Sequence, residues 1–136
     1  MLSPCVGVAS ENRHAAAEAI LCEQDTCRSV TILVWDGDSF ILHDARGGRE
    51  KIRIENIDAL EIDGRCAAER SAAVKAKNEL VRLLDDGRIS LVRGKLDRYR
   101  RQLARVISDN GDVGDRLVTL GLVRRWDGRR KPWCPG

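Results

Sequence analysis

Apolar residues in the first half of the chain follow a pattern that predicts β-strands. Residues 30–34 are almost wholly apolar and β-branched, and the apolar run resumes at 40–42 after a polar break. Residues 51–54 then alternate with a period of two, so that Arg53 should point away from the core. The pattern predicts three consecutive strands joined by tight turns.

Helical spacing replaces this alternation over residues 67–84, and Gly87 suits the end of that helix. Residues 88–92 and 102–107 read as two further strands, and Asp112 can cap a short final helix. Five short strands, with a helix after the third and a second helix near the C-terminus, predict a mainly β (α+β) fold. A five-stranded Greek-key barrel of the oligonucleotide-binding type (OB-fold) fits this order, and a mixed open sheet is the alternative.

Length and composition indicate one domain, since the chain has 136 residues and is 43% hydrophobic. Residues 1–27 show no strand alternation, and an alanine-rich turn or two of helix is expected within 14–24. We therefore predict an N-terminal extension or leader remnant at 1–27 and the domain at 28–136. No run approaches the about 18 apolar residues of a membrane span, and no export signal or membrane association is predicted.

Charge is unevenly distributed along the chain, whose formal net charge is +3. Residues 1–27 hold four acids against Arg13 and are net −3, which leaves residues 28–136 net +6. Basic side chains gather at 93–105 and 124–131. Either run alone could be solvated surface charge, but together they favour a polyanionic partner.

The five cysteines are many for a reduced domain of this size, but their number is odd and only Cys22 and Cys27 are close in sequence. Neither a zinc site nor a complete disulfide framework follows from this spacing. A bridge between Cys66 and Cys134 is expected on condition that the protein meets an oxidising compartment.

Three short stretches carry acidic and guanidinium groups: DGDS at 36–39, IRIENIDALE at 52–61 and DRYRR at 97–101. Two carboxylates can hold a hard divalent cation, a third acid can activate water, and two arginines can neutralise a phosphate under attack. Taken singly, each stretch also fits a favourable turn, a solvated strand end or a basic face. Their order, each at a predicted strand end or turn, favours metal-assisted hydrolysis of phosphodiesters.

With LGLVRRW at 120–126, these stretches resemble the thermonuclease family, whose type member is staphylococcal nuclease. The resemblance runs from about Arg28 to Cys134 and includes the motif order and the helix after the acidic motif. It implies an OB-fold barrel that acts as a calcium-dependent, sugar-nonspecific endonuclease on DNA and RNA. The implied partners are nucleic acids. Single strands are the expected better substrates, because stacking on Tyr99 accepts any base, and the chain is expected to act as a monomer. Family members are often exported, but the sequence itself assigns no compartment.

Position by position, the resemblance assigns a role to each candidate site residue. It implies calcium-binding carboxylates at Asp38 and Asp58 and a calcium-binding carbonyl at Ala59. It implies that Glu61 is the general base for the attacking water. The remaining assignments are two catalytic, phosphate-binding arginines, Arg53 and Arg101, and a tyrosine lining the nucleotide pocket, Tyr99.

The chain departs from the family pattern at three positions. Arg100 replaces a glycine that commonly precedes the second arginine, Leu60 stands where proline is usual, and Ser39 replaces threonine. If position 100 requires a positive φ angle, its side chain strains the turn by about 1–2 kcal/mol. These departures keep open the alternative of a non-catalytic nucleic-acid-binding barrel. A module that binds other partners is a third hypothesis.

Overall fold

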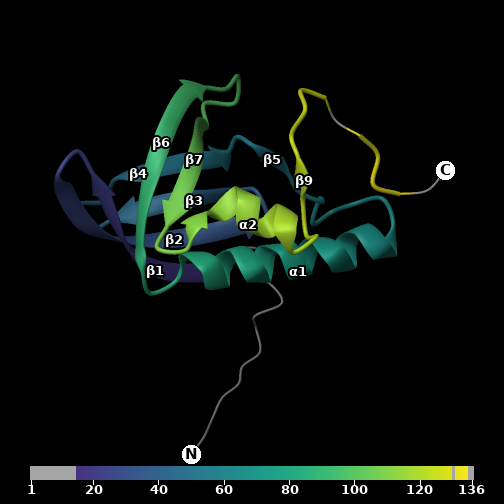
Figure 1. The fold of residues 1–136 in the computed structure, drawn as a ribbon, viewed down its shortest axis with the longest axis horizontal. Coiled ribbons are helices and arrows are strands. Elements are labelled where there is room, and N and C mark those ends of the chain that lie inside the picture. Colours follow the sequence, from purple (N-terminus) through teal and green to yellow (C-terminus); the bar gives the residue numbers. More distant parts are fainter. Residues whose placement is uncertain (1–14, 130, 135–136) are drawn as a thin grey trace, which may run out of the picture.

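A curved, mostly antiparallel sheet closes on itself in the computed structural model, which describes residues 15–129 and 131–134 (Figure 1). The strand order is β4-β3-β2-β1-β6-β7-β8, and β4 also pairs with β7, which closes the barrel. A small second sheet joins β5 to β9. The elements are β1 (Ala15–Glu23), β2 (Thr26–Asp36), β3 (Ser39–Asp44), β4 (Arg49–Ile54), β5 (Ile57–Asp58), α1 (Ala67–Leu84), β6 (Arg88–Leu96), β7 (Gln102–Ser108), β8 (Gly111–Asp112), α2 (Val113–Thr119) and β9 (Arg124–Arg125).

The barrel interior confirms the predicted alternation. Ile52 and Ile54 of β4 are fully buried, whereas Arg53 between them points to the other face. Burying a side chain of this size stabilises a fold by about 1.5–3 kcal/mol. The parallel pairing of β4 with β7 rules out the mixed open sheet and confirms the predicted barrel with helices.

Helix α1 packs against the barrel through the apolar stripe that the sequence predicts, which includes the buried residues Ala73, Ala76 and Leu80. A β-carbon on Gly37 would lie 2.9 Å from Cβ of Ala76 and 3.1 Å from Cβ of Ala59. Only glycine therefore lets the turn between β2 and β3 approach the helix this closely. The contact holds the acidic turn against the barrel wall. Neither described helix is long and apolar enough to cross a membrane.

The helix expected within residues 14–24 is wrong, because Ala15–Glu23 form strand β1. This strand pairs with β2 from Ala15 opposite Val34 to Glu23 opposite Thr26. Ala17, Ala19 and Leu21 face the core, so tertiary pairing overrides the helix propensity of alanine. The described part of the expected extension, residues 15–27, thus belongs to the barrel sheet, while residues 1–14 lie outside the described residues.

Two disulfides tie elements together in the described part of the chain. One joins Cys22 to Cys27 across the tip of the β1–β2 hairpin, where the two residues are paired in register. The other joins Cys66, just before α1, to Cys134 in the C-terminal tail. The second is the bridge that the sequence analysis expects under oxidising conditions.

Candidate active site

A cavity of about 610 Å³ lies where the β2–β3 turn, the end of β4, the β6–β7 loop and the residue after β9 meet. Five of the predicted site residues line it: Asp38, Arg53, Glu61, Tyr99 and Arg101. The other two predicted residues, Asp58 and Ala59, are buried beside it, and the main-chain N–H of Ala59 donates to Oδ2 of Asp38 at 2.9 Å. Residues up to 63 positions apart in sequence therefore meet in one place.

The acidic turn is held rigidly by its own hydrogen bonds. Oδ1 of Asp36 accepts the N–H of Asp38 at 3.2 Å and the hydroxyl of Ser39 at 2.8 Å. The carbonyl of Asp38 in turn accepts the N–H of Ile54 at 2.8 Å, which ties the turn to the end of β4. Asp36, which the sequence analysis did not single out, is thus the residue that shapes the turn.

Asp38 lies in an environment that disfavours its negative charge. Burial raises the pKa of this carboxyl well above its ordinary value, and the neighbouring Asp36 raises it further, whereas Arg53 acts in the opposite direction. The guanidinium of Arg53 is 3.5 Å from Oδ2 of Asp38. Two acids buried this close together favour the arrival of a cation, which would stabilise their charged forms.

Arg53 is fixed in the cavity wall by main-chain carbonyls. Its Nη1 donates to the carbonyl of Ile57 at 2.8 Å and also to that of Ile54, and its side chain is 12% exposed. The guanidinium also lies 5.9 Å from the ring centre of Trp126, on the segment after β9. An arginine held on several sides has little side-chain entropy left to lose when it binds an anion.

The β6–β7 loop is organised around Asp97. This carboxylate accepts the N–H groups of Tyr99 and Arg101 at 2.8 and 2.9 Å and the Nε of Arg101 at 2.8 Å. Burial alone would raise the pKa of Asp97, but the hydrogen bonds from Arg101 and Tyr99 outweigh it, so the pKa lies below its ordinary value. Tyr99 is 61% exposed, with the guanidiniums of Arg98 and Arg101 at 5.1 and 5.5 Å from its ring centre.

Arg100 adopts the left-handed conformation that the missing glycine suggests, with φ of +64°. We expect Arg100→Gly to raise the free energy of unfolding by about 1 kcal/mol, because glycine adopts this conformation without strain. Urea denaturation would measure the change. Arg98 belongs to the same loop but lacks a positive φ, so Arg98→Gly should not stabilise. Equal effects of the two substitutions would contradict strain at Arg100.

Glu61 lies between β5 and α1 in the chain and lines the cavity. Its main-chain N–H donates to Oε2 of Glu69 at 3.1 Å, and the N–H of Arg65 donates to Oε1 of the same carboxylate at 3.2 Å. Glu69 is only 7% exposed, although it lies in the first turn of the helix. The only signal of Glu69 in the sequence is an acid at a predicted helix start, which does not mark it as a functional residue.

A second group of metal-ligand types lies beside this loop, where ligand atoms of Cys66, Glu69 and Cys134 are all within 4.8 Å of one another. The two sulfurs are joined in a disulfide, so neither is a thiolate that could bind a metal. Asp38 belongs to no such group among the described residues: no two other acidic or histidine side chains have ligand atoms this close to it and to each other. A hard cation there would bind two carboxylates together with main-chain carbonyl and water oxygens, which calcium accepts.

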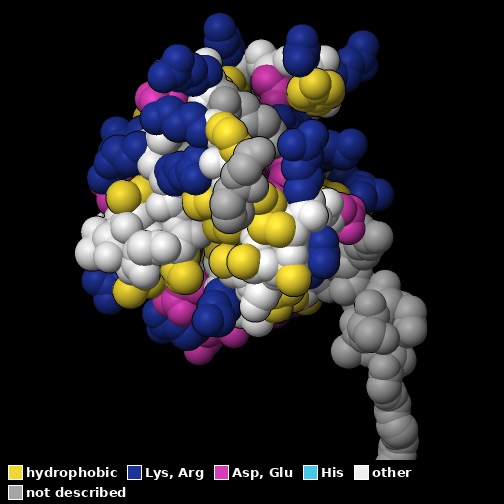
Figure 2. Space-filling view, turned by 90° about the vertical axis from the view of Figure 1, so that its right-hand side faces the viewer, with side chains coloured by type: hydrophobic (Ala, Val, Ile, Leu, Met, Phe, Trp, Pro, Cys, Tyr) yellow, Lys and Arg dark blue, Asp and Glu magenta, His cyan; other side chains and the backbone are white. Residues whose placement is uncertain are grey.

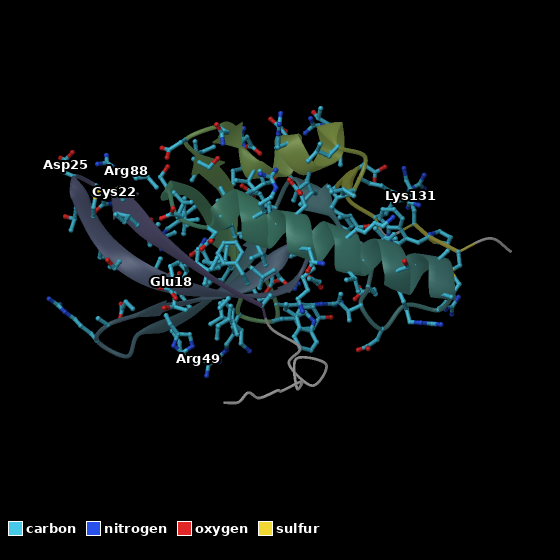
Figure 3. The ribbon with its side chains drawn as sticks, turned by 90° about the horizontal axis from the view of Figure 1, so that it is seen from below. Glu18, Cys22, Asp25, Arg49, Arg88 and Lys131 are labelled. Carbon is cyan, nitrogen blue, oxygen red and sulfur yellow. A yellow bond between two sulfur atoms is a disulfide. The ribbon has the colours of Figure 1, made fainter. Side chains whose placement is uncertain are left out.

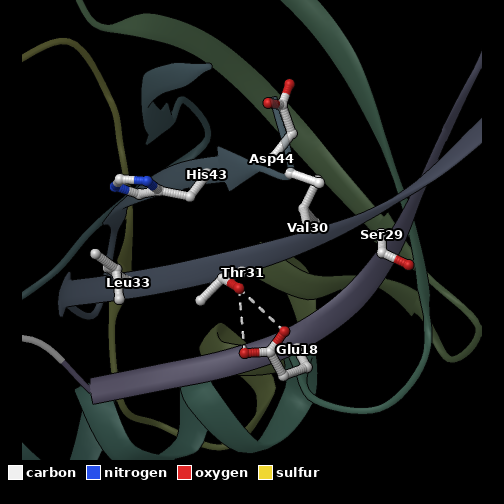
Figure 4. Close-up of a pocket in the computed structure, with 8 residues that line it drawn as sticks. Glu18, Ser29, Val30, Thr31, Leu33, His43 and Asp44 are labelled. Carbon is white, nitrogen blue, oxygen red and sulfur yellow. Dashed lines mark hydrogen bonds between the residues drawn. The ribbon is translucent and has the colours of Figure 1, made fainter. Parts of the chain in front are cut away.

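The outer face of β1–β3 carries a separate hollow of about 440 Å³ (Figure 4). In it, the hydroxyl of Thr31 donates to both carboxylate oxygens of Glu18, at 3.1 and 3.2 Å. His43 and Asp44 also line it, but none of the predicted site residues does. The hollow is therefore not the place where the predicted chemistry comes together.

Lys and Arg side chains cover much of the upper half of the molecular face that includes the C-terminal tail (Figure 2). Asp and Glu side chains are fewer on this half and lie between the basic ones. A surface of this kind attracts polyanions and raises their local concentration.

A family model described as staphylococcal nuclease homologue matches residues 51–132, which is more than half of the chain. The matched part includes Arg53, Asp58, Glu61 and Arg101, whereas Asp38 lies before it. No curated protein matches the chain.

Proposed function

Because the chain belongs to the staphylococcal nuclease homologue family, and is therefore a nuclease-like or nucleic-acid-binding module, we propose that it is a calcium-dependent nuclease. The proposed reaction is hydrolysis of phosphodiester bonds in DNA and RNA. The observation that supports it most is that the acids Asp38 and Glu61 and the arginines Arg53 and Arg101 are among the residues that line one cavity. That combination suits a scissile phosphate better than a neutral ligand.

Asp38 and Asp58, with the carbonyl of Ala59, are the proposed calcium ligands. The donor set fits the ion, because calcium takes oxygen ligands with loose geometry. The positive charge of Arg53 does not offset the burial of Asp38 and its neighbour Asp36, so a bound cation would stabilise their carboxylates. When bound, calcium would polarise the phosphoryl oxygen and favour the attacking water as hydroxide.

The chain's own residues supply the rest of the mechanism. Glu61, which lines the same cavity as the arginines, accepts the proton of the attacking water. Arg53 and Arg101 donate to the phosphate oxygens, whose charge grows as the water attacks in line. Asp97 keeps Arg101 directed into the cavity through its bond to Nε.

Substrate recognition is proposed to depend on phosphates and stacking, with little dependence on base identity. Tyr99 offers an exposed ring at one side of the cavity, and Trp126, 39% exposed, offers another. Stacking on aromatic rings accepts every base and requires an unpaired strand, so single-stranded DNA and RNA should be preferred. We propose that the monomer is the active form, since all the residues named belong to one chain.

Digestion of heat-denatured DNA and of RNA tests this proposal. We expect both substrates to be cleaved with calcium and neither with the chelator EGTA, and duplex DNA to be cleaved more slowly. Undiminished cleavage in EGTA would exclude the proposed metal role. A wild-type protein that binds denatured DNA in a salt-dependent manner, yet does not cleave it in the presence of any divalent ion, would establish the non-catalytic binder. The φ of +64° at Arg100 favours that second candidate, because a strained residue directly before Arg101 departs from the glycine that the nuclease pattern has there.

A further inference from the structure

Glu69 is a buried carboxylate around which the loop from Glu61 to Arg65 is folded. Its two oxygens separately accept the N–H of Glu61 and the N–H of Arg65. A β-carbon on Gly64 would lie 2.4 Å from Cδ of Glu69, so the loop passes directly over the carboxylate. The guanidinium of Arg70 donates to the carbonyl of Gly64 at 2.9 Å and also holds the loop against the helix. The position of the Glu61 main chain therefore depends on Glu69.

The C-terminal tail closes over the same carboxylate. Sγ of Cys134 is 3.3 Å from Oε1 of Glu69, and a disulfide sulfur carries no proton, so this is a packing contact that covers one side of the carboxylate. The disulfide from Cys134 to Cys66 attaches the tail to the start of α1. Arg124 binds the tail as well, through the carbonyl of Pro132 at 3.1 Å and the ring of Trp133 at 3.6 Å.

A cavity of about 780 Å³ lies between this tail and the Glu61–Cys66 loop, and Glu61 lines it as well as the proposed active site. Glu61 thus borders both the cavity under the tail and the proposed active-site cavity. The hydrogen bond from the Glu61 N–H to Oε2 of Glu69 connects the carboxylate under the tail to the main chain of Glu61.

We propose that Glu69 is a positioning residue for Glu61 and that the Cys66–Cys134 disulfide, by covering Glu69, makes the nuclease redox-sensitive. This inference rests on the proposed function. Glu69 acts through the main chain of Glu61 and touches no reacting atom. The oxidised protein is the fully active form, and the reduced protein is the slower one.

The redox step is an exchange with a dithiol. A thiolate of the dithiol attacks one sulfur of the Cys66–Cys134 bond, and its second thiol then releases the protein as two thiols. The dithiol loses two electrons and becomes a cyclic disulfide, while each cysteine gains one electron and one proton. In the reduced protein the tail keeps its contacts with Arg124 but loses its covalent attachment beside Glu69.

Cysteine variants separate this disulfide from the other one. We expect the double substitution Cys66→Ser, Cys134→Ser to lower kcat on denatured DNA about tenfold with little change in KM. It should also abolish any further effect of dithiothreitol. The matched control is Cys22→Ser, Cys27→Ser, which removes the disulfide at the hairpin tip. Cys22 lies at the far end of the molecule from Lys131 of the tail (Figure 3), so this variant should keep wild-type kcat and stay sensitive to dithiothreitol.

A double-mutant cycle tests the connection to Glu61. Glu69→Gln keeps the shape but replaces one acceptor oxygen by an amide donor that faces an N–H, and we expect kcat to fall about tenfold. In a Glu61→Gln background the same substitution should have almost no further effect on kcat, because Glu69 acts through Glu61. Glu79→Gln, on the same helix and paired with Arg82, is the control and should leave kcat unchanged.

Two further measurements make every outcome decisive. Oligonucleotide affinity in EGTA, read by fluorescence anisotropy, should be the same for all variants, and thermal melting shows whether each is folded. Additive losses in the cycle, or folded Cys66/Cys134 variants with wild-type kcat, would overturn the inference while the nuclease assignment stands. If the wild type cleaves nothing with any divalent ion, the proposed function fails first, before any variant is compared.

Discussion

Glu61→Gln is expected to lower kcat on denatured DNA about a thousandfold, the largest loss from any substitution in the site. Glutamine has the size of glutamate but cannot accept the proton of the attacking water, and general-base catalysis contributes about 10²–10⁴-fold to such rates. Because Glu61 lines the cavity without facing the phosphate as a donor, KM should change little. Initial rates with calcium at saturating substrate measure the effect.

The folding stability of the variant distinguishes loss of a base from a change of structure. Unfolding by urea should give the same midpoint for both proteins within experimental error. A folded variant that keeps more than a tenth of wild-type kcat would show that Glu61 is not the general base.

The barrel could be predicted from sequence because its signals are local. Period-two alternation in β4 places Ile52 and Ile54 inside and Arg53 outside, and that assignment depends only on neighbours in the chain. Helix α1 was predictable for the same reason, since its buried stripe repeats with helical spacing. Local signals also favoured a helix in 14–24, and there the prediction was wrong. Nine residues of pairing with β2 decide the structure of β1, and alanine composition does not reveal that pairing.

The candidate site was predictable only where residue type and chain order carry information. Asp38, Glu61 and Arg53 could be nominated because acids and arginines at strand ends suggested phosphate chemistry, and they do line one cavity. The residues that hold them in place gave no such signal. Glu69 and Asp97 are ordinary acids in the sequence, and each becomes important because main-chain N–H groups converge on it in the folded chain. These hydrogen bonds span only two to eight residues, but they depend on the conformation that each loop adopts, which residue type and spacing do not reveal.

Arg53→Lys is the second substitution for which a large loss is expected, although it keeps the charge. Nη1 of Arg53 is already engaged by the carbonyls of Ile54 and Ile57, and only a planar fork has further nitrogens to present to a phosphate at the same time. A lysine ammonium is compact and must choose between the carbonyls, Asp38 and the phosphate. We expect kcat/KM on denatured DNA to fall about a hundredfold.

Arg49→Lys on the same strand is the matched control for this substitution, because Arg49 is exposed and is not among the residues that line the proposed active-site cavity. It should leave kcat/KM within about twofold of the wild type, as expected for an exposed basic side chain outside the site. The Arg53→Lys protein should lose about 1 kcal/mol of unfolding free energy, because lysine makes fewer hydrogen bonds to the carbonyls of Ile54 and Ile57. This loss is too small to unfold the barrel. A folded Arg53→Lys protein with near wild-type kcat/KM would mean that a positive charge suffices at this position. The bidentate contact would then be no part of the mechanism, and Arg101 would be left as the principal phosphate donor.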